Sequence, residues 1–491
     1  MVSPSYREAK KFADAGEYRT LPVSRELYAD SLTPIMALRR LKNVSRHVFL
    51  LESVEKSRRW GRYTFLGFDP AMELTCLSGK LTIRAGSAVT MDTKNPSDVI
   101  RQVLADNRSP RLPGLPPFTG GLVGYFAYDY IQYAEPTLHL DARDEEGYKD
   151  VDLMLFDKVI AFDNDRQKVL LIMNIRLSDV DTEYRRAEME LENLKNLLLG
   201  GEVRRETPGQ MISPVRELIG KDDYCRMVDR AKEHIREGDI FQVVLSNRLD
   251  ADFEGSLLDT YRVLRTTNPS PYMFYFSSDE IEIAGASPET LVKLEDGILH
   301  TFPLAGTRPR GKTNEEDRRL EEELLRDEKE LAEHNMLVDL GRNDLGKISK
   351  FGTVAVEEHM SIERFSHVMH IGSTVRGEIR PEFDALSAVE AVLPAGTLSG
   401  APKIRACEII DELEGVKRGI YGGAIGYIDF SGNLDTCIAI RIAYKKNGKV
   451  CVRSGAGIVA DSVPESEYQE CLNKARAVVR ALEIAQGGLD E

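Results

Sequence analysis

Short β-patterned segments separated by glycine and proline constrain the fold of this chain more than any other feature. Between residues 20 and 175 each segment is rich in apolar and aromatic residues and ends in a turn signal. The segments read "HVFLLES", "RYTFLGF", "LTIRAG", "GLVGYFAY", "KVIAFD" and "KVLLIMNI". Single helical patterns stand between such segments, without a regular alternation of strand and helix. This arrangement favours a mixed α+β fold.

A change in composition predicts a boundary near the middle of the chain. A helix is predicted at about 179–199, with Gly200 placed to end it. The segment "GGEVRRETPGQMISP" then has the glycine, proline and polar content of a linker. A second helix is predicted at about 221–237, followed by the strand "DIFQVVLS". We therefore expect a β-rich N-terminal region at 1–205 and a second region at 215–488.

Composition excludes several classes of protein. The longest apolar runs, such as "VLLIM", are too short to cross a bilayer, and the N-terminus lacks a signal-peptide pattern. The six cysteines contain no Cys-x-x-Cys motif, which predicts a reducing, cytoplasmic location. The formal charge of −15 argues against nucleic acid and anionic membranes as partners. An anionic substrate would therefore need positive potential supplied locally, by a metal, by arginine or lysine, or by backbone amides.

Two Glu-x-x-Glu pairs stand out among the charged residues. Glu330 and Glu333 lie where a charged helical pattern turns apolar, and neither has a lysine or arginine at i+4, where His334 and Leu337 stand. Glu467 and Glu470 flank the apolar stripe of a helix predicted to start at Pro464. Each pair alone is also compatible with a solvated helix face. Together, on two helices, they could hold a hard divalent cation such as Mg²⁺ through oxygen.

Two glycine-rich segments are candidates for anion binding. "SGAGIVADS" superficially matches a dinucleotide fingerprint, but the following helix begins too late, after Pro464. Gly455 and Gly457 therefore form a tight turn, or let backbone N–H groups approach a carboxylate. "LPAGTLSGAPK" opens a predicted helix, where Thr397 either caps the helix or borders an anion site.

Two further residues are candidates for proton transfer. His370 lies in the strand-like run "SHVMHIGS", where a structural role is the alternative. Glu289 follows Ser-Pro between two β-like segments, where it is either solvated or a general acid or base. The chain shows no zinc-type His/Cys cluster and no Gly-x-Ser-x-Gly elbow.

Taken in order, these segments resemble the chorismate-utilising enzymes, and within that family the large subunits of anthranilate synthase. The matching blocks cover essentially all of residues 221–477. They read "GDIFQVVLSNR", "NPSPYMFYF", "AGASPETLV", "PLAGTRPRG", "DEKELAEHNMLVDLGRND", "HVMHIGSTVRG", "LPAGTLSGAPK", "GIYGGAIGYIDFSGNLDTCIAIR" and "GAGIVADSVPESEYQECLNKA". "LLES" and "GRYTFLGFDP" extend the likeness into the N-terminal half. The resemblance implies two large, mostly antiparallel β-sheets packed as a sandwich with peripheral helices.

The resemblance also implies roles for individual residues. The two glutamate pairs would surround a Mg²⁺ that holds the ring carboxylate of chorismate, with Glu333 and Glu470 as direct ligands and Glu330 and Glu467 holding waters. Glu289 would protonate the leaving C4 hydroxyl, and His370 would serve the later elimination of pyruvate. The implied substrate-binding residues are Gly306, Thr307, Thr397, Tyr421, Arg441, Gly455, Gly457 and Lys474.

Two positions divide this family by chemistry. Isochorismate and salicylate synthases carry a water-activating lysine where this chain has Gln242, and glutamine cannot act as a base. Aminodeoxychorismate synthases carry a lysine nucleophile where this chain has Ala305. Both differences favour ammonia as nucleophile and anthranilate as product. A catalytically silent, tryptophan-binding subunit on the same fold is the alternative from another class.

The resemblance further implies partners and regulation. No Gly-x-Cys-x-Gly motif of a glutaminase occurs, so we expect a glutamine amidotransferase partner, component II, and a hetero-oligomer. Feedback inhibition by L-tryptophan is expected in a pocket between the two halves. Its implied lining residues are Leu51, Glu52, Ser53, Pro271, Tyr272, Met273, Tyr427 and Cys437.

Overall fold

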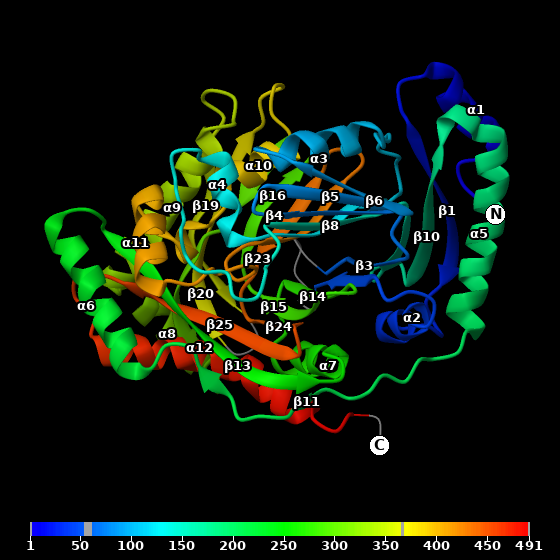
Figure 1. Cartoon of the computed structure of the whole chain (residues 1–491). Helices are drawn as coiled ribbons and strands as arrows, with labels where there is room; N and C mark the ends of the chain where they lie inside the picture. The colour runs from blue at the N-terminus through cyan, green and yellow to red at the C-terminus, as the bar shows by residue number, and fades with distance from the viewer. Residues whose placement is uncertain (1, 54–60, 365–367, 490–491) are drawn as a thin grey trace.

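The computed structural model describes residues 2–53, 61–364 and 368–489. Within these residues the strands form two large sheets, and the strand pairs within each sheet are antiparallel, as in the β13–β25 and β7–β8 ladders. His367, in the predicted strand around His370, lies outside the described residues. Helices lie around the outside of the two sheets (Figure 1). The expected α+β class, with two antiparallel sheets and peripheral helices, is confirmed.

The first sheet has 13 strands in the described residues. Along its main path it runs β1 (Thr20–Tyr28), β10 (Lys168–Arg176), β9 (Lys158–Asp163), β3 (Tyr63–Phe68), β2 (Val48–Glu52), β14 (Tyr272–Ser277), β15 (Glu282–Ser287), β24 (Ile442–Lys446), β25 (Lys449–Ile458), β13 (Gln242–Glu254) and β11 (Gln210–Met211). The short strands β12 (Arg216–Glu217) and β21 (Gly400–Ala401) also pair with β13.

The second sheet has 12 strands in the same part of the chain. Its order is β18 (Leu304–Pro309), β20 (Val368–Glu378), β17 (Ile298–Thr301), β16 (Thr290–Glu295), β23 (Leu434–Ile438), β22 (Ala424–Asp429), β7 (Gly121–Phe126), β8 (Val151–Phe156), β4 (Met72–Leu77), β5 (Lys80–Ala85) and β6 (Ser87–Asp92), with β19 (Ala355–Arg364) beside β20.

The two sheets pack face to face over an aromatic core. Phe49 of β2 in the first sheet meets Phe156 of β8 in the second, with ring centroids 4.7 Å apart. Tyr427 of β22 lies against Phe118 at 4.4 Å. Both contacts belong to one buried cluster built from strands of both sheets. Burial of this apolar surface holds the sandwich together.

Helices cover the outer faces. α5 packs on β10 with α1 and α2 nearby, whereas α12 packs on β25 and against α6 and α7 (Figure 1). The helices are α1 (Tyr6–Ala15), α2 (Pro34–Leu41), α3 (Pro96–Ala105), α4 (Ile131–Ala134), α5 (Val180–Gly200), α6 (Lys221–Glu237), α7 (Leu258–Thr267), α8 (Asn314–Leu324), α9 (Glu328–Gly346), α10 (Ala385–Val392), α11 (Lys403–Glu414) and α12 (Pro464–Ala485), with 3₁₀ turns η1 (Tyr128–Tyr130), η2 (Leu177–Asp179) and η3 (Gly396–Leu398). In the part of the chain described, no helix has the length and apolar character needed to span a membrane.

Both halves of the sequence contribute strands to each sheet. β2 pairs with β14, and β7 lies between β8 and β22. The predicted boundary between 205 and 215 falls between α5 and β12, in a segment that contains the short strand β11, and the division into two regions stays a prediction. The candidate residues of the second region are therefore held in sheets that the first region helps to build.

Candidate active site and a second cavity

Glu289 lies in the short connection between β15 and β16, next to the turn η3. Thr397 on η3 donates a hydrogen bond from Oγ1 to Glu289 Oε1 over 3.1 Å. Burial raises the pKa of the Glu289 carboxyl to about 7, although the Thr397 hydrogen bond and the charges of Arg441 and Lys474 oppose the shift. A carboxyl group with this pKa can carry a proton near neutral pH, which a general acid needs.

His370 of β20 faces the strand β18. Its Nδ1 lies 2.8 Å from the Gly306 carbonyl oxygen and 3.1 Å from Thr307 Oγ1. Since a carbonyl only accepts hydrogen bonds, Nδ1 carries the proton and Nε2 is the basic nitrogen. Burial lowers the pKa of His370, and the charge of Arg441 adds to the effect. The imidazole is therefore neutral at neutral pH and able to accept a proton.

Arg441 connects the two proton-transfer residues electrostatically. It lies between β23 and β24 in a left-handed backbone conformation with φ of 52°. Burial lowers the pKa of its guanidinium, and the charge of Glu289 opposes that shift. Because the charge of this half-buried guanidinium is poorly solvated, an anion that binds beside it stabilises it.

The two glycines of β25 leave room where side chains would collide. A Cβ at Gly455 would lie 2.7 Å from the Leu245 carbonyl oxygen and 3.1 Å from Tyr421 Oη. A Cβ at Gly457 would lie 2.7 Å from Nε2 of Gln242. Lys474 Nζ donates to the Gly455 carbonyl oxygen at 3.1 Å. Tyr421, the two glycines and Lys474 thus form one wall beside Glu289.

The two predicted glutamate pairs lie on α9 and α12. Burial raises the pKa of Glu333, and the charges of Glu330 and Glu470 raise it further. Burial also raises the pKa of Glu467, and Glu470 adds to that shift. Carboxylates from two helices that repel one another are the donor set that a hard divalent cation fits. A Cβ at Gly306 would lie 3.2 Å from Glu330 Oε2, which places Glu330 beside β18, the strand that His370 faces.

Two basic side chains partly neutralise these glutamates. Lys474 Nζ lies 2.8 Å from Glu470 Oε1, and Arg308 Nη1 lies 3.6 Å from Glu330 Oε1. The sequence positions one helical turn from Glu330 could not reveal Arg308 as its partner, because Arg308 lies on β18. In the described residues, possible metal-ligand atoms of three His, Cys, Asp or Glu side chains lie within 4.8 Å of one another only at His234, Glu237 and Asp239. The four predicted glutamates do not meet this criterion. Arg405 lies 3.0 Å from Asp239 there and disfavours a cation.

All eight residues implied for the inhibitor border one cavity of about 130 Å³ between the sheets. The Glu52 carboxylate is turned away to Arg265, at 2.6 Å from Nε, and to Tyr261 Oη at 2.5 Å. Lys293 and Asp435 also line the cavity, although the family resemblance did not point to them. Each is a charged residue placed among apolar residues within a strand, in "TLVKLE" and "LDTCI", and that pattern was the available signal.

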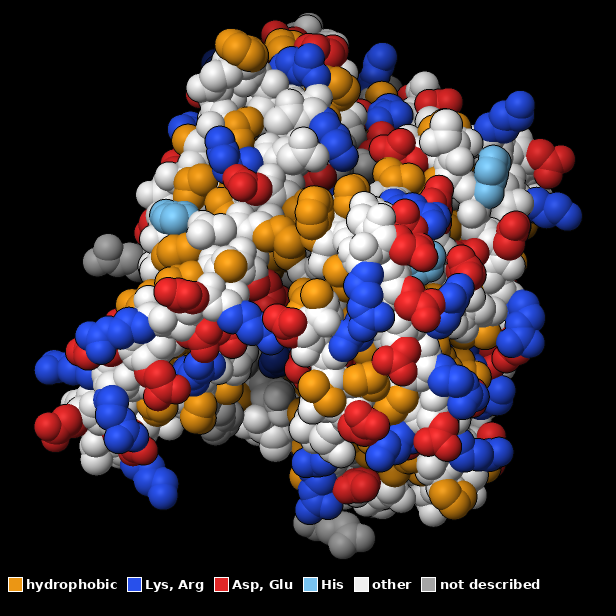
Figure 2. Space-filling view, turned by 90° about the vertical axis from the view of Figure 1, so that its left-hand side faces the viewer, with side chains coloured by type: hydrophobic (Ala, Val, Ile, Leu, Met, Phe, Trp, Pro, Cys, Tyr) orange, Lys and Arg blue, Asp and Glu red, His pale blue; other side chains and the backbone are white. Residues whose placement is uncertain are grey.

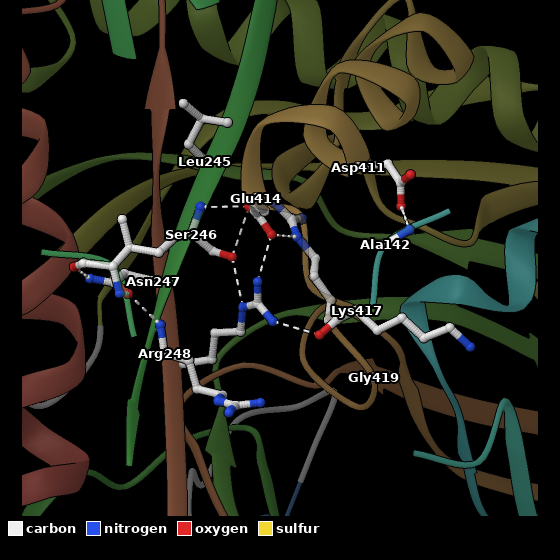
Figure 3. Close-up of polar contacts among 12 residues, drawn as sticks. Ala142, Leu245, Ser246, Asn247, Arg248, Asp411, Glu414, Lys417 and Gly419 are labelled. Carbon is white, nitrogen blue, oxygen red and sulfur yellow. Dashed lines mark hydrogen bonds and ion pairs between the residues drawn. The ribbon is translucent and has the colours of Figure 1, made fainter. Parts of the chain in front are cut away.

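The sequence analysis also did not predict a buried ionic network that lies behind the wall of Tyr421 and Gly455. Figure 3 shows Ser246 of β13 directed toward Glu414 at the end of α11. The arginines at 418 and 453 complete this network. Glu414 and Arg418 are an i,i+4 pair in the sequence, but no local pattern joins them to Ser246 on β13 or to Arg453 on β25.

A hollow lies on the face that Figure 2 turns toward the viewer, between two lobes, with acidic and basic side chains mixed along its rim.

Comparisons with known proteins agree with one another. Residues 46–480 match the family described as chorismate binding enzyme. The anthranilate synthase component 1 of Acetivibrio thermocellus is 47% identical over 496 residues, covering 99% of each chain. The corresponding protein of Pseudomonas aeruginosa is 44% identical, covering 97% of this chain and 98% of its own.

Solved structures show the same fold. The crystal structure of anthranilate synthase component I from Streptococcus pneumoniae aligns with a TM-score of 0.75 at 38% identity, covering 93% of this chain and 99% of that one. The menaquinone-specific isochorismate synthase of Escherichia coli aligns with a TM-score of 0.69 at 19% identity, covering 97% of this chain and 99% of that one, and shows the shared fold alone.

Proposed function

This chain belongs to the family of chorismate-binding enzymes, and from that premise we propose that it is the large subunit of an anthranilate synthase. It converts chorismate and ammonia into anthranilate and pyruvate for tryptophan biosynthesis, in the cytoplasm. The observation that carries the proposal is Glu289, a carboxyl group with a pKa of about 7 held by Thr397 beside Arg441.

Proton transfer in the first step belongs to Glu289. Ammonia adds at C2 of the ring while the C4 hydroxyl leaves, and hydroxide is a poor leaving group unless it receives a proton. Glu289 donates that proton, so the hydroxyl departs as water. Thr397 holds the carboxyl group in place through the 3.1 Å hydrogen bond.

In the second step a base removes the C2 proton, the bond between the ring and the enolpyruvyl oxygen breaks, and the ring becomes aromatic. The released enolpyruvate takes up a proton at its methylene carbon and becomes pyruvate. His370 serves this half of the reaction as the proton acceptor. Its neutral state and the Nδ1 hydrogen bond to Gly306 support the assignment. Thr307 lies at the same nitrogen and steadies the ring.

Binding of the dianionic substrate falls to the surrounding residues. Arg441, Tyr421 and the amides at Gly455 and Gly457 receive one carboxylate, and Lys474 adds a positive charge at the same wall. Glu333 and Glu470 would bind Mg²⁺ directly, with Glu330 and Glu467 holding its waters. When bound, the ion supplies positive charge for the ring carboxylate.

The choice of ammonia over water or an enzyme nucleophile rests on two residues. Gln242 is 4% exposed and directs its amide nitrogen toward Gly457, and an amide has no basic site to activate water. Ala305 in β18 offers no nucleophile for a covalent intermediate. Isochorismate, salicylate and aminodeoxychorismate synthesis are therefore the less favoured alternatives.

The deciding experiment is to mix purified protein with chorismate, ammonium and Mg²⁺ and to follow the fluorescence of anthranilate. Formation of anthranilate together with one equivalent of pyruvate is the expected result. If the protein binds chorismate and tryptophan but releases no product, the silent regulatory subunit is the better assignment. Isochorismate or aminodeoxychorismate as product would assign one of the sibling reactions.

A further inference from the structure

A fully buried ionic network lies behind the substrate wall, and the proposed reaction does not use it. Its ionised members are Glu414, Arg418 and Arg453, which are 7%, 2% and 1% exposed. Glu414 Oε1 accepts from Arg418 Nη2 at 2.5 Å, and Glu414 Oε2 accepts from Arg453 Nη2 at 2.6 Å. Ser246 joins them by donating to Glu414 at 2.9 Å and accepting from Arg453 Nε at 2.9 Å.

Arg418 makes contacts that neutralising Glu414 does not require. Its Nη1 donates to the Leu398 carbonyl oxygen at 2.5 Å, and its Nη2 donates to the Val244 carbonyl oxygen at 2.7 Å. The guanidinium also lies over the Tyr128 ring at 4.6 Å and near the Tyr421 ring at 5.8 Å. One planar group therefore fixes η3, β13 and the segment that carries Tyr421.

The contacts with Leu398, Val244 and Tyr421 end at, or next to, residues assigned above to the substrate wall. Leu398 follows Thr397, whose hydroxyl holds Glu289. Val244 pairs with Gly457 across the β13–β25 ladder, and Ser246 pairs with Gly455. Figure 3 shows β13 with Leu245, Ser246 and Asn247 running past Glu414 at this point.

We propose that Arg418, held by Glu414, is the positioning residue that aligns Thr397, Tyr421 and the Gly455–Gly457 backbone into one binding wall for chorismate. The inference rests on the proposed function of that wall. Burial of three charges is costly and gives little net stability over apolar packing. The forked guanidinium instead holds three separate segments in fixed positions relative to one another.

The test is Arg418→Lys in the full chain, compared with Arg248→Lys as a matched control. Arg248 is also buried, at 4%, and it lies on β13, the strand to which Arg418 donates, but its partners are Asp250 and Glu146. A lysine keeps the charge at either position but loses the fork. Thermal unfolding should show both variants folded, with a reduced melting temperature.

Chorismate binding is measured by titration calorimetry with Mg²⁺ and without ammonia, and KM and kcat are measured where turnover occurs. We expect Arg418→Lys to weaken chorismate binding by about tenfold or more, because displaced wall segments lose alignment. The KM for ammonium and the affinity for tryptophan should stay at the parent values. Arg248→Lys should bind chorismate as the parent does.

Parent-like chorismate binding by folded Arg418→Lys, or an equal loss in Arg248→Lys, would overturn the proposal. If Arg418→Lys does not fold, Ser246→Ala decides, since it removes the hydroxyl bridge and leaves every charge. Weaker chorismate binding by Ser246→Ala supports the proposal, and unchanged binding rejects it. The calorimetry needs no product, so a parent that binds chorismate without forming anthranilate would refute the proposed function and leave this test readable.

Discussion

At the scale of single residues, the raised pKa of Glu289 predicts the pH dependence of turnover. A general acid is active while protonated, so kcat/KM should fall as the pH rises through about 7. Glu289→Gln should lower kcat by roughly 10²- to 10⁴-fold. The measurement is the initial rate of anthranilate formation from about pH 6 to about pH 9, at constant free ammonia.

Thr397 provides the control for this assignment. Its hydrogen bond lowers the pKa of Glu289, so Thr397→Val should move the alkaline limb of the profile to higher pH. An unmoved limb in Thr397→Val, or a Glu289→Gln variant with the parent's rate, would assign the proton to another group.

A second prediction at this scale concerns the glutamate pairs. Glu333→Gln or Glu470→Gln keeps the shape of the side chain but removes a negative charge, so the Mg²⁺ concentration for half-maximal activity should rise by about tenfold or more. Stabilisation by Mg²⁺ in thermal unfolding should weaken in parallel. Glu322→Gln on the exposed face of α8 is the control and should behave as the parent. Full activity of either variant in excess chelator contradicts the assignment.

At the scale of elements, local patterns predicted where helices and strands lie. The helix expected at about 179–199 is α5, Val180–Gly200, and the one at about 221–237 is α6, Lys221–Glu237. Apolar periodicity and the stop at Gly238, with φ of 86°, depend on neighbours within one helical turn. The charged run before Glu330 is not one continuous helix. It divides into α8 and α9 at 325–327, where Asp327 caps the second helix.

Pairings between distant strands could not be derived from these patterns. Nothing in "VFLLE" by itself selects "YMFYFS" as its neighbour, yet all of β2 pairs with Met273–Ser277 of β14. The approach of Arg308 to Glu330 and the network around Glu414 are consequences of such pairings. The site residues were found by resemblance in sequence, whereas their partners became visible only in the fold.

The pairing of β2 with β14 yields the prediction for regulation. Ser53 and Met273 lie at the ends of these strands and border the same cavity of about 130 Å³. Ser53→Phe should fill the cavity while leaving α9 and α12 intact, giving an active enzyme that tryptophan does not inhibit. Inhibition curves for anthranilate formation measure this.

The control is Ser87→Phe on the exposed strand β6, which should be inhibited as the parent is. Parent-like inhibition of Ser53→Phe would place the inhibitor elsewhere. A parent that ignores tryptophan altogether would point to a different pathway.

At the scale of the whole molecule, the thiols predict how the enzyme obtains ammonia. Burial raises the pKa of each of the six cysteines, so none is a ready thiolate nucleophile of the kind a glutaminase uses. The purified chain should therefore use ammonium salts but not glutamine. Adding a glutaminase component should confer glutamine-dependent turnover, and glutamine-dependent turnover by the single chain would contradict the prediction.

Sharing of both sheets between the two halves of the sequence has a consequence during synthesis on the ribosome. β7 leaves the ribosome in the first third of synthesis and can pair with β8 soon afterwards. Its other neighbour, β22, leaves the ribosome roughly 300 residues later. At typical elongation rates that interval lasts on the order of 15 to 60 seconds. Throughout it, one edge of the buried strand Gly121–Phe126 has unpaired N–H and C=O groups, which invite pairing with other nascent chains. We therefore expect a chaperone that covers this edge to reduce aggregation during synthesis, and slower translation to lengthen the time for which such cover is needed.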